Sequence, residues 1–214
     1  MLSDSINEES NSEQLRQALS RTQRQLAEAK QRNLDLSDAT YRGAFDAVMA
    51  LPPIKPVLAP KKDVRKTKSE VALIHATDWQ GSKVTTSYNS DVMRKRVMEF
   101  AEKSVKITEI QRSDHPVKDC TIMFGGDMVE GLFNYPAQLW EIDASLFTQF
   151  TTVSFLMVDF VRVYLANYET VTVVAEWGNH GRIGSKRDHV PKSDNIDRMC
   201  YEFARQMLKN EKRL

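Results

Sequence analysis

The pattern of apolar positions divides the second part of the chain into short runs of two kinds. Three runs are continuously apolar at their centres, as expected of β-strands covered on both faces, and they lie at residues 71–78, 120–127 and 171–179. Three longer segments repeat apolar residues at helical spacing, at about residues 90–111, 137–167 and 194–210. This alternation predicts an α/β domain with a layered, mostly parallel sheet, because crossovers between parallel strands are right-handed.

The first 50 residues follow a different pattern, rich in Gln, Glu, Arg, Ala and Leu, with a single glycine. A spacing of four and three residues places one stripe on a helix face, made of Leu15, Leu19, Thr22, Leu26, Ala29, Asn33 and Leu36. The stripe predicts a helical arm over residues 1–50 that could pair as a coiled coil and make the protein a homo-oligomer. Thr22 and Ala29 weaken this seam, so a single helix fits the pattern equally well.

A proline-rich and basic segment, residues 51–69, separates the arm from the domain expected over residues 70–214. Proline fixes φ and removes a backbone donor, so the segment is predicted to be an extended linker. Its lysines and arginines could contact phosphate groups, although solvation is the commoner role of such a run.

Composition narrows the class of protein. The chain has 214 residues, 41% of them hydrophobic, which is enough for a core and argues against global disorder. Its formal net charge of +1 neither requires nor excludes a nucleic-acid partner. Cys120 and Cys200 share no metal-ligand spacing and are expected to be buried, reduced thiols.

The apolar runs are too short for a membrane protein. The longest, Phe155–Val163, is interrupted by Asp159 and Arg162, and a transmembrane helix needs about 20 apolar residues. The first residues, MLSDSINEES, are polar and unlike a secretory leader. We therefore expect no membrane partner and a cytoplasmic location.

Each predicted strand ends in a polar turn that contains glycine: TDWQG at 77–81, GGDMVEG at 125–131 and WGNHGR at 177–182. Carboxyl ends of parallel strands meet at one edge of a sheet, where these turns would gather Asp78, Gln80, Asp127, Glu130, Asn179 and His180. Carboxylate and amide oxygens with an imidazole suit hard or borderline divalent cations. Each aspartate alone fits ordinary turn chemistry, but the three turns together favour a metal site.

These turns resemble the first three signature blocks of the calcineurin-like metallophosphoesterases, D-x-H, G-D-x-x-[DE] and G-N-H-[DE], in order and spacing. The resemblance covers about residues 70–210 and extends to phage-encoded members related to the nuclease subunits of break-repair complexes. It implies the first half of a four-layer αββα sandwich and a location in the cytoplasm, that of the host cell for a phage protein.

The resemblance also implies a role for each residue. Asp78 would bind the first of two divalent metal ions, Asp127 would bridge both and Asn179 would bind the second. Manganese is the expected metal, with Mg²⁺, Fe²⁺ or Zn²⁺ as alternatives. His180 would face the substrate phosphate and Glu130 would orient it. The implied reaction is hydrolysis of a phosphate ester, with a phosphodiester of nucleic acid as the leading substrate.

Three departures from the family pattern stand out. Gln80 replaces the histidine of the first block and would bind metal through its amide oxygen. Gly181 replaces the acidic residue of the third block, and Arg182 after it is a candidate for substrate binding or for the surface. No later histidine block occurs before Leu214, so we expect the domain to be incomplete, with the missing ligands supplied by a longer gene or another chain.

The sequence also fits other classes of protein. The chain could be a non-catalytic module of the same fold that acts as a structural or interaction subunit through its N-terminal helix. A dinucleotide-binding domain fits poorly, because GGDMVEG lacks the G-x-G-x-x-G spacing. Trp79 and Trp177 flank the proposed ligands and could stack on a base or belong to the core, and Asp194 is expected to cap the last helix.

Overall fold

The computed structural model describes every residue of the chain except 1, 53, 67, 133, 136 and 184–193. The chain divides into two units, Met1–Asp46 and Ala47–Leu214, which are described separately.

The described residues of the first unit belong to helix α1, Leu2–Met49, a helix of 48 residues. The described leucines of the predicted stripe are exposed: Leu15 by 70%, Leu19 by 59% and Leu26 by 57%. The helix expected in this region is therefore present, whereas its pairing as a coiled coil stays a prediction. The side chains of Asn33 and Leu36 lie outside the described part of the chain.

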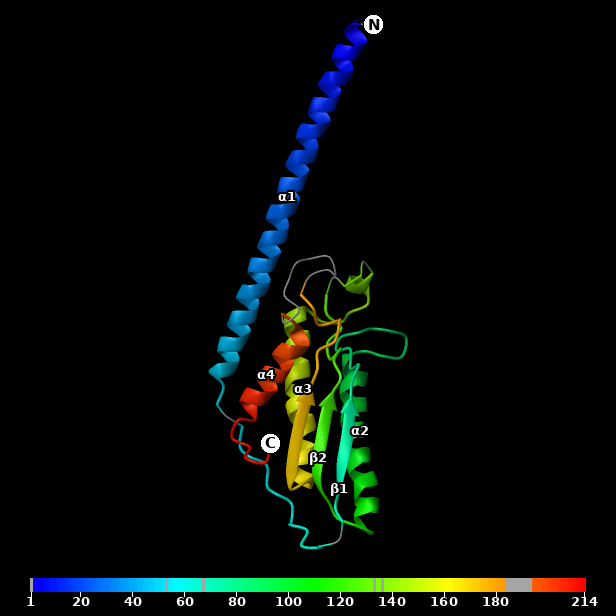
Figure 1. Ribbon diagram of the computed structural model, residues 1–214, viewed down its shortest axis with the longest axis vertical. Helices are drawn as coiled ribbons and strands as arrows, with labels where there is room; N and C mark the ends of the chain where they lie inside the picture. Colours follow the sequence, from blue (N-terminus) through cyan, green and yellow to red (C-terminus); the bar gives the residue numbers. More distant parts are fainter. Residues whose placement is uncertain (1, 53, 67, 133, 136, 184–193) are drawn as a thin grey trace. The chain divides into compact units, whose positions relative to one another are not determined.

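The second unit is built on a three-stranded parallel sheet in the order β1-β2-β3 (Figure 1). Its strands are β1, Glu70–Ala76, β2, Val117–Phe124, and β3, Thr170–Ala175. The described elements thus confirm a mixed α/β fold with a parallel sheet. All three strands end two to four residues earlier than predicted, because the polar turns begin where the ladder stops.

Helices α2, Ser90–Arg112, and α3, Leu146–Asn167, connect the strands, and α4, Ile196–Met207, packs on α3 (Figure 1). The helix predicted over 137–167 is divided. A short 3₁₀ helix, η1, covers Gln138–Trp140, and α3 begins only after Ser145, whose hydroxyl accepts the Thr148 N–H. The separation arises because residues 141–143 pair with the loop after β1, where Lys83 bridges Ile142.

The prediction that the strands are covered on both faces is wrong for the part of the chain that the structure describes. Most residues on one face of the sheet are buried, among them Ile122 with 0% exposure. Alternate residues point the other way and are exposed: Val71 by 58%, Leu73 by 64%, Met123 by 39% and Val174 by 52%. The described elements therefore supply the helices of one face only, and a four-layer sandwich is not seen.

An aromatic cluster anchors the helices to the buried face. The Trp79 ring lies 5.7 Å from that of Phe124 and 5.4 Å from that of Phe160, both edge to face. Trp79 is 5% exposed and Phe160 0%, so Trp79 belongs to the core. The two cysteines are also buried and free, and burial raises the pKa of the Cys120 thiol to about 12.

Among the described helices, α3 alone has the length and apolar composition to cross a membrane. Many of its apolar residues, including Val153, Phe160 and Leu165, are buried within the domain. Core packing is a sufficient reason for this composition.

The described residues of the proline-rich segment form no helix or strand, and hydrogen bonds anchor the segment to the domain as a strap. The Val57 N–H donates to Glu211 Oε1 at 3.0 Å, and the Asp63 N–H donates to Glu169 Oε1 at 2.8 Å. Arg65 donates to the carbonyl of Arg112 at 2.9 Å, at the end of α2 that precedes β2. The basic run thus lies by the amino ends of the strands, about 20 Å of strand length from their carboxyl ends.

Phe160→Ala is expected to lower the free energy of unfolding by about 3–5 kcal/mol, because it empties the centre of the aromatic cluster. Equilibrium urea denaturation measures the change. Phe147→Ala is the control, since Phe147 lies on the same helix and is 52% exposed. Equal losses in the two variants would contradict the position assigned to Phe160.

The pH dependence of stability in an Asp63→Asn variant tests whether the Asp63–Arg65 pair stabilises the strap. The hydrogen bonds from Arg65 lower the pKa of Asp63 from 3.8 to about 2. Because the pKa of Asp63 is lower in the folded chain than in the unfolded chain, ionised Asp63 stabilises the fold at pH values above the unfolded pKa. This stabilisation is lost as the pH falls toward 2. Asp63→Asn should therefore lower the thermal midpoint at about pH 6 and match wild type near pH 2. A difference independent of pH would show that the charge has no role.

Candidate metal centre

The three polar turns meet at the carboxyl edge of the sheet. The Asp78 N–H donates to the Gly126 carbonyl at 3.1 Å, and the Gln80 N–H donates to the Asp127 carbonyl at 2.9 Å. The third turn joins them through the His180 N–H, which donates to Asp127 Oδ1 at 2.7 Å. Three segments far apart in the sequence are thus in direct hydrogen-bonded contact around Asp127.

The backbone at this edge is unusual in its conformation. Three candidate ligands have positive φ, namely 54° at Asp78, 43° at Gln80 and 52° at Asp127. Each such residue costs about 1–3 kcal/mol unless its surroundings hold it, and such residues cluster at functional sites. The turns also approach very closely, since a Cβ on Gly126 would lie 2.3 Å from the Gly178 nitrogen.

The candidate ligands form a set of oxygen donors. Asp78 and Asn179 are exposed, whereas Gln80 and Asp127 are half-buried. The Asp78 carboxylate accepts the Thr77 hydroxyl at 2.7 Å. In the described ranges no three His, Cys, Asp or Glu side chains group closely enough to hold a metal. The candidate donors at this edge are the two carboxylates and the amide oxygens of Gln80 and Asn179, which are of the kind that hard divalent cations prefer.

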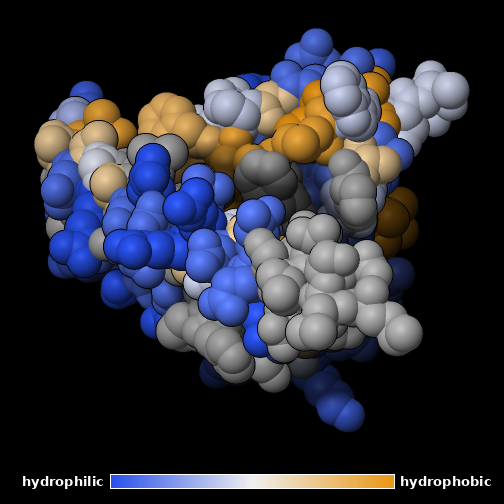
Figure 2. Space-filling view, turned by 90° about the horizontal axis from the view of Figure 1, so that it is seen from above, coloured by the Kyte–Doolittle hydropathy of each residue, from blue (hydrophilic) through white to orange (hydrophobic). Residues whose placement is uncertain are grey.

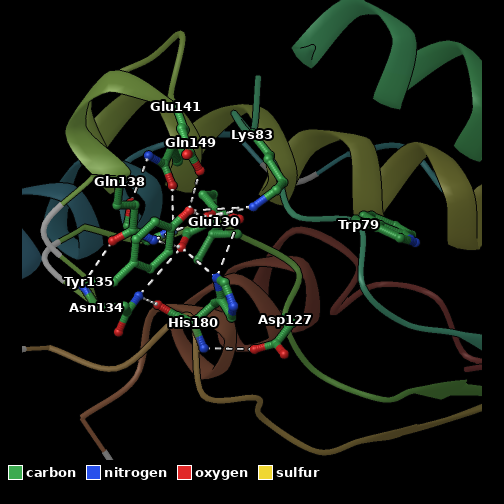
Figure 3. A network of polar contacts seen from close by, with 12 residues as sticks. Trp79, Lys83, Asp127, Glu130, Asn134, Tyr135, Gln138, Glu141, Gln149 and His180 are labelled. Atoms are coloured by element: carbon green, nitrogen blue, oxygen red, sulfur yellow. Dashed lines mark hydrogen bonds and ion pairs between the residues drawn. The ribbon is translucent and has the colours of Figure 1, made fainter. Parts of the chain in front are cut away.

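Buried Glu130 and half-buried His180 form a pair beside Asp127 (Figure 3). His180 Nδ1 lies 3.0 Å from the Glu130 carbonyl oxygen and 3.3 Å from its Oε2. Both neighbours are acceptors, so Nδ1 carries a hydrogen. The other carboxylate oxygen, Oε1, accepts from Tyr135 at 3.0 Å, from Gln138 at 3.2 Å and from Lys83 at 3.3 Å.

The pair shifts the titration of both members. The Glu130 carboxylate raises the pKa of His180, against the opposing effect of burial. Burial alone would raise the pKa of Glu130, but hydrogen bonds from His180, Gln138 and Tyr135 outweigh it, and the pKa of Glu130 is lowered. The arrangement favours an imidazolium beside a carboxylate.

Arg182 is held next to the third turn by a residue that the motifs do not include. Its Nε donates to Asn134 Oδ1 at 3.1 Å, and Asn134 Nδ2 donates to the His180 carbonyl at 2.8 Å. Arg182 is half-buried, so its guanidinium is oriented at the site. His189, in the loop that follows, lies outside the described residues.

Sequence reasoning missed a second buried carboxylate, Asp197. Its oxygens accept backbone N–H groups from the turns after β2 and β3, among them those of Asp127 and Gly178. The expectation that Asp194 caps the last helix is wrong, because Asn195 is the N-cap. The sequence contains one indication of Asp197, because it is an acidic residue in the first turn of the helix that follows the motif turns. Acidic residues are common in the first turn of helices, so this indication is weak.

Exposed aromatic residues lie on the segments that lead to the site. Trp177, 39% exposed, immediately precedes the third turn, and the Arg198 guanidinium lies 5.9 Å from its ring. Trp140 on η1 is 88% exposed. Among the described residues seen from above, both hydrophilic and hydrophobic side chains lie at the surface (Figure 2).

Comparison of the chain with protein-family models, with curated proteins and with solved structures found no match in any of the three.

Proposed function

We propose that this chain is a metal-dependent phosphoesterase of the calcineurin-like type, which hydrolyses phosphate esters with two divalent cations. The observation that carries the proposal is the convergence of the three motif turns on Asp127, with the His180–Glu130 pair beside it. The motif order supports the same reading. The chain would act in the cytoplasm, that of the host cell for a phage protein.

Asp78, Gln80, Asp127 and Asn179 would hold the cations, with Mn²⁺ as the expected metal and Mg²⁺, Fe²⁺ or Zn²⁺ as alternatives. Bound divalent cations polarise phosphoryl oxygens and make a nucleophile of water near neutral pH. The protein's own contribution is to gather these donors on turns whose backbones already touch. The positive φ values of Asp78, Gln80 and Asp127 support the proposal, because such backbone conformations persist only where the surrounding structure holds them.

His180 would donate a hydrogen bond or proton from Nε2 to the leaving oxygen of the substrate. Glu130 orients the ring through Nδ1 and is itself held by three donors. Arg182, oriented by Asn134, would bind a substrate phosphate oxygen, because a guanidinium matches that group in geometry and charge.

A phosphodiester of nucleic acid is the proposed substrate. The support is the family resemblance together with Arg182 and the exposed ring of Trp177, on which a base could stack. The basic run at 61–68 gives no support, because it lies by the opposite edge of the sheet.

The rest of the architecture leads to two further proposals. The exposed apolar side chains on one sheet face, such as Leu73 and Val174, support a domain that is the first half of a four-layer αββα sandwich. The exposed leucines of α1 support an oligomerising coiled coil. A non-catalytic subunit that works through α1 is the alternative function, and the same observation on α1 favours it.

Hydrolysis of bis-p-nitrophenyl phosphate with added Mn²⁺ tests the enzyme proposal. We expect activity in the wild type, its loss with a chelator and its recovery with Mn²⁺. Asp127→Asn should abolish it, because Asp127 is the residue on which all three turns converge. His180→Ala should lower kcat about 10²–10⁴-fold, the usual contribution of a general acid.

Asp63→Asn is the control, because it makes the same chemical change on the strap by the opposite edge of the sheet. It should retain wild-type activity. Equal rates in wild type, Asp127→Asn and His180→Ala would reject the enzyme proposal and favour the non-catalytic subunit.

Light scattering coupled to size-exclusion chromatography tests the coiled coil. The wild type should elute as an oligomer, and a double variant, Leu19→Asn with Leu26→Asn, should shift it to a monomer by placing polar groups in the seam. Arg21→Gln, an exposed change outside the stripe, should leave the mass unchanged. A monomeric wild type would contradict the proposal of a coiled coil.

A further inference from the structure

The turns after β2 and β3 share one buried carboxylate. Asp197 has 0% exposure, and its Oδ2 accepts the N–H groups of Asp127 at 2.8 Å and Gly178 at 2.9 Å. Its Oδ1 accepts those of Met128 at 3.0 Å and Val129 at 3.2 Å. One side chain therefore binds four backbone donors from two segments, and both segments carry candidate ligands.

The neighbouring N-cap residue holds the same turn from its other side. Asn195 Oδ1 accepts the Asp197 N–H at 2.8 Å, which starts α4, and Asn195 Nδ2 donates to the Gly178 carbonyl at 2.9 Å. The Ile196 N–H donates to the Gly181 carbonyl at 2.6 Å. The start of α4 is thus hydrogen-bonded to the third motif turn on both sides of Asn179 and His180.

We propose that Asp197, assisted by Asn195, is the positioning residue of the candidate metal centre. It sets the distance between Asp127 and the turn that presents Asn179, and so it determines the affinity for the cations. The proposal rests on the proposed function, because it concerns the geometry of the same ligands.

The chemistry of a carboxylate explains why aspartate occupies this position. A carboxylate only accepts hydrogen bonds, and both of its oxygens can each serve two N–H groups. An asparagine at Asp197 would turn its own NH₂ group toward one pair of donors, so either the pair at Asp127 and Gly178 or the pair at Met128 and Val129 would separate. Loss of such an outer-shell contact typically costs 10–100-fold in metal affinity.

A second carboxylate offers a matched control. Asp143 accepts the Ser82 hydroxyl at 2.8 Å and the Ser90 N–H and hydroxyl at 2.9 and 2.7 Å. It also joins two loops by accepting hydrogen bonds, but these bonds reach none of the candidate ligands. A purely structural role for Asp197 predicts that both aspartates behave alike.

The experiment is a calorimetric titration with Mn²⁺ of the full-length wild type and of Asp197→Asn, Asp143→Asn and Asp127→Asn, each first shown to be folded by circular dichroism. Asp197→Asn should raise the Mn²⁺ dissociation constant about 10–100-fold. Asp143→Asn should change it less than about twofold even where its thermal midpoint falls, and Asp127→Asn should abolish binding.

Each other result overturns something specific. Wild-type affinity in Asp197→Asn, or equal weakening in Asp143→Asn, overturns the positioning role and leaves the metal centre standing, provided that Asp127→Asn has lost binding. A wild type that binds no Mn²⁺ overturns both proposals. If Asp197→Asn does not fold, Asn195→Ser replaces it, since serine keeps the helix cap and removes only the bond to the Gly178 carbonyl. This variant should weaken Mn²⁺ binding several-fold, and unchanged binding would overturn the role.

Discussion

Buried backbone N–H groups need acceptors, and in this chain the turns after β2 and β3 direct four of theirs to the carboxylate of Asp197. Those N–H groups have no ladder to join, because the strands end before the turns begin. Because the two turns share this acceptor, their N–H groups are hydrogen-bonded even though they lie outside the sheet. The backbone can therefore have a positive φ at Asp127 without leaving these donors unpaired. Two of the candidate ligands, Asp127 and Asn179, lie on the turns that this one interaction joins.

A second buried carboxylate organises the surroundings of His180. Glu130 is desolvated, and an unpaired buried charge would be costly. The cost is offset by donors from His180, Tyr135, Gln138 and Lys83. Glu130 and Asp197 thus have different roles. Glu130 orients the imidazole of His180, and Asp197 holds the turns after β2 and β3 together.

The two ends of the sheet have separate roles in the described domain. The carboxyl edge carries strained turns and polar networks, whereas the strap and its basic residues lie by the amino edge, tied by Glu169, Glu211 and Arg65. One face of the sheet is filled by an aromatic and aliphatic core, and the other presents apolar side chains such as Leu73 outward. Because apolar residues also occupy the exposed face, the strands have continuously apolar centres, and the sequence therefore predicted strands covered on both faces.

Local sequence patterns were sufficient to predict the strands and most of the helices, and to predict that the motif turns meet. Apolar runs and helical spacing identify the strands and helices of the parallel α/β fold, because side-chain periodicity is a property of neighbouring residues. Three turns that follow parallel strands must end at one edge, so the approach of Asp127 to the turn of His180 followed from topology alone. Tertiary structure decided what depends on distant contacts. These include the acceptor role of Asp197, the division of the helix before α3, the burial of Trp79 and the anchoring of the strap. Each depends on which donor or ring a side chain meets across the fold, and sequence spacing carries no information about that partner.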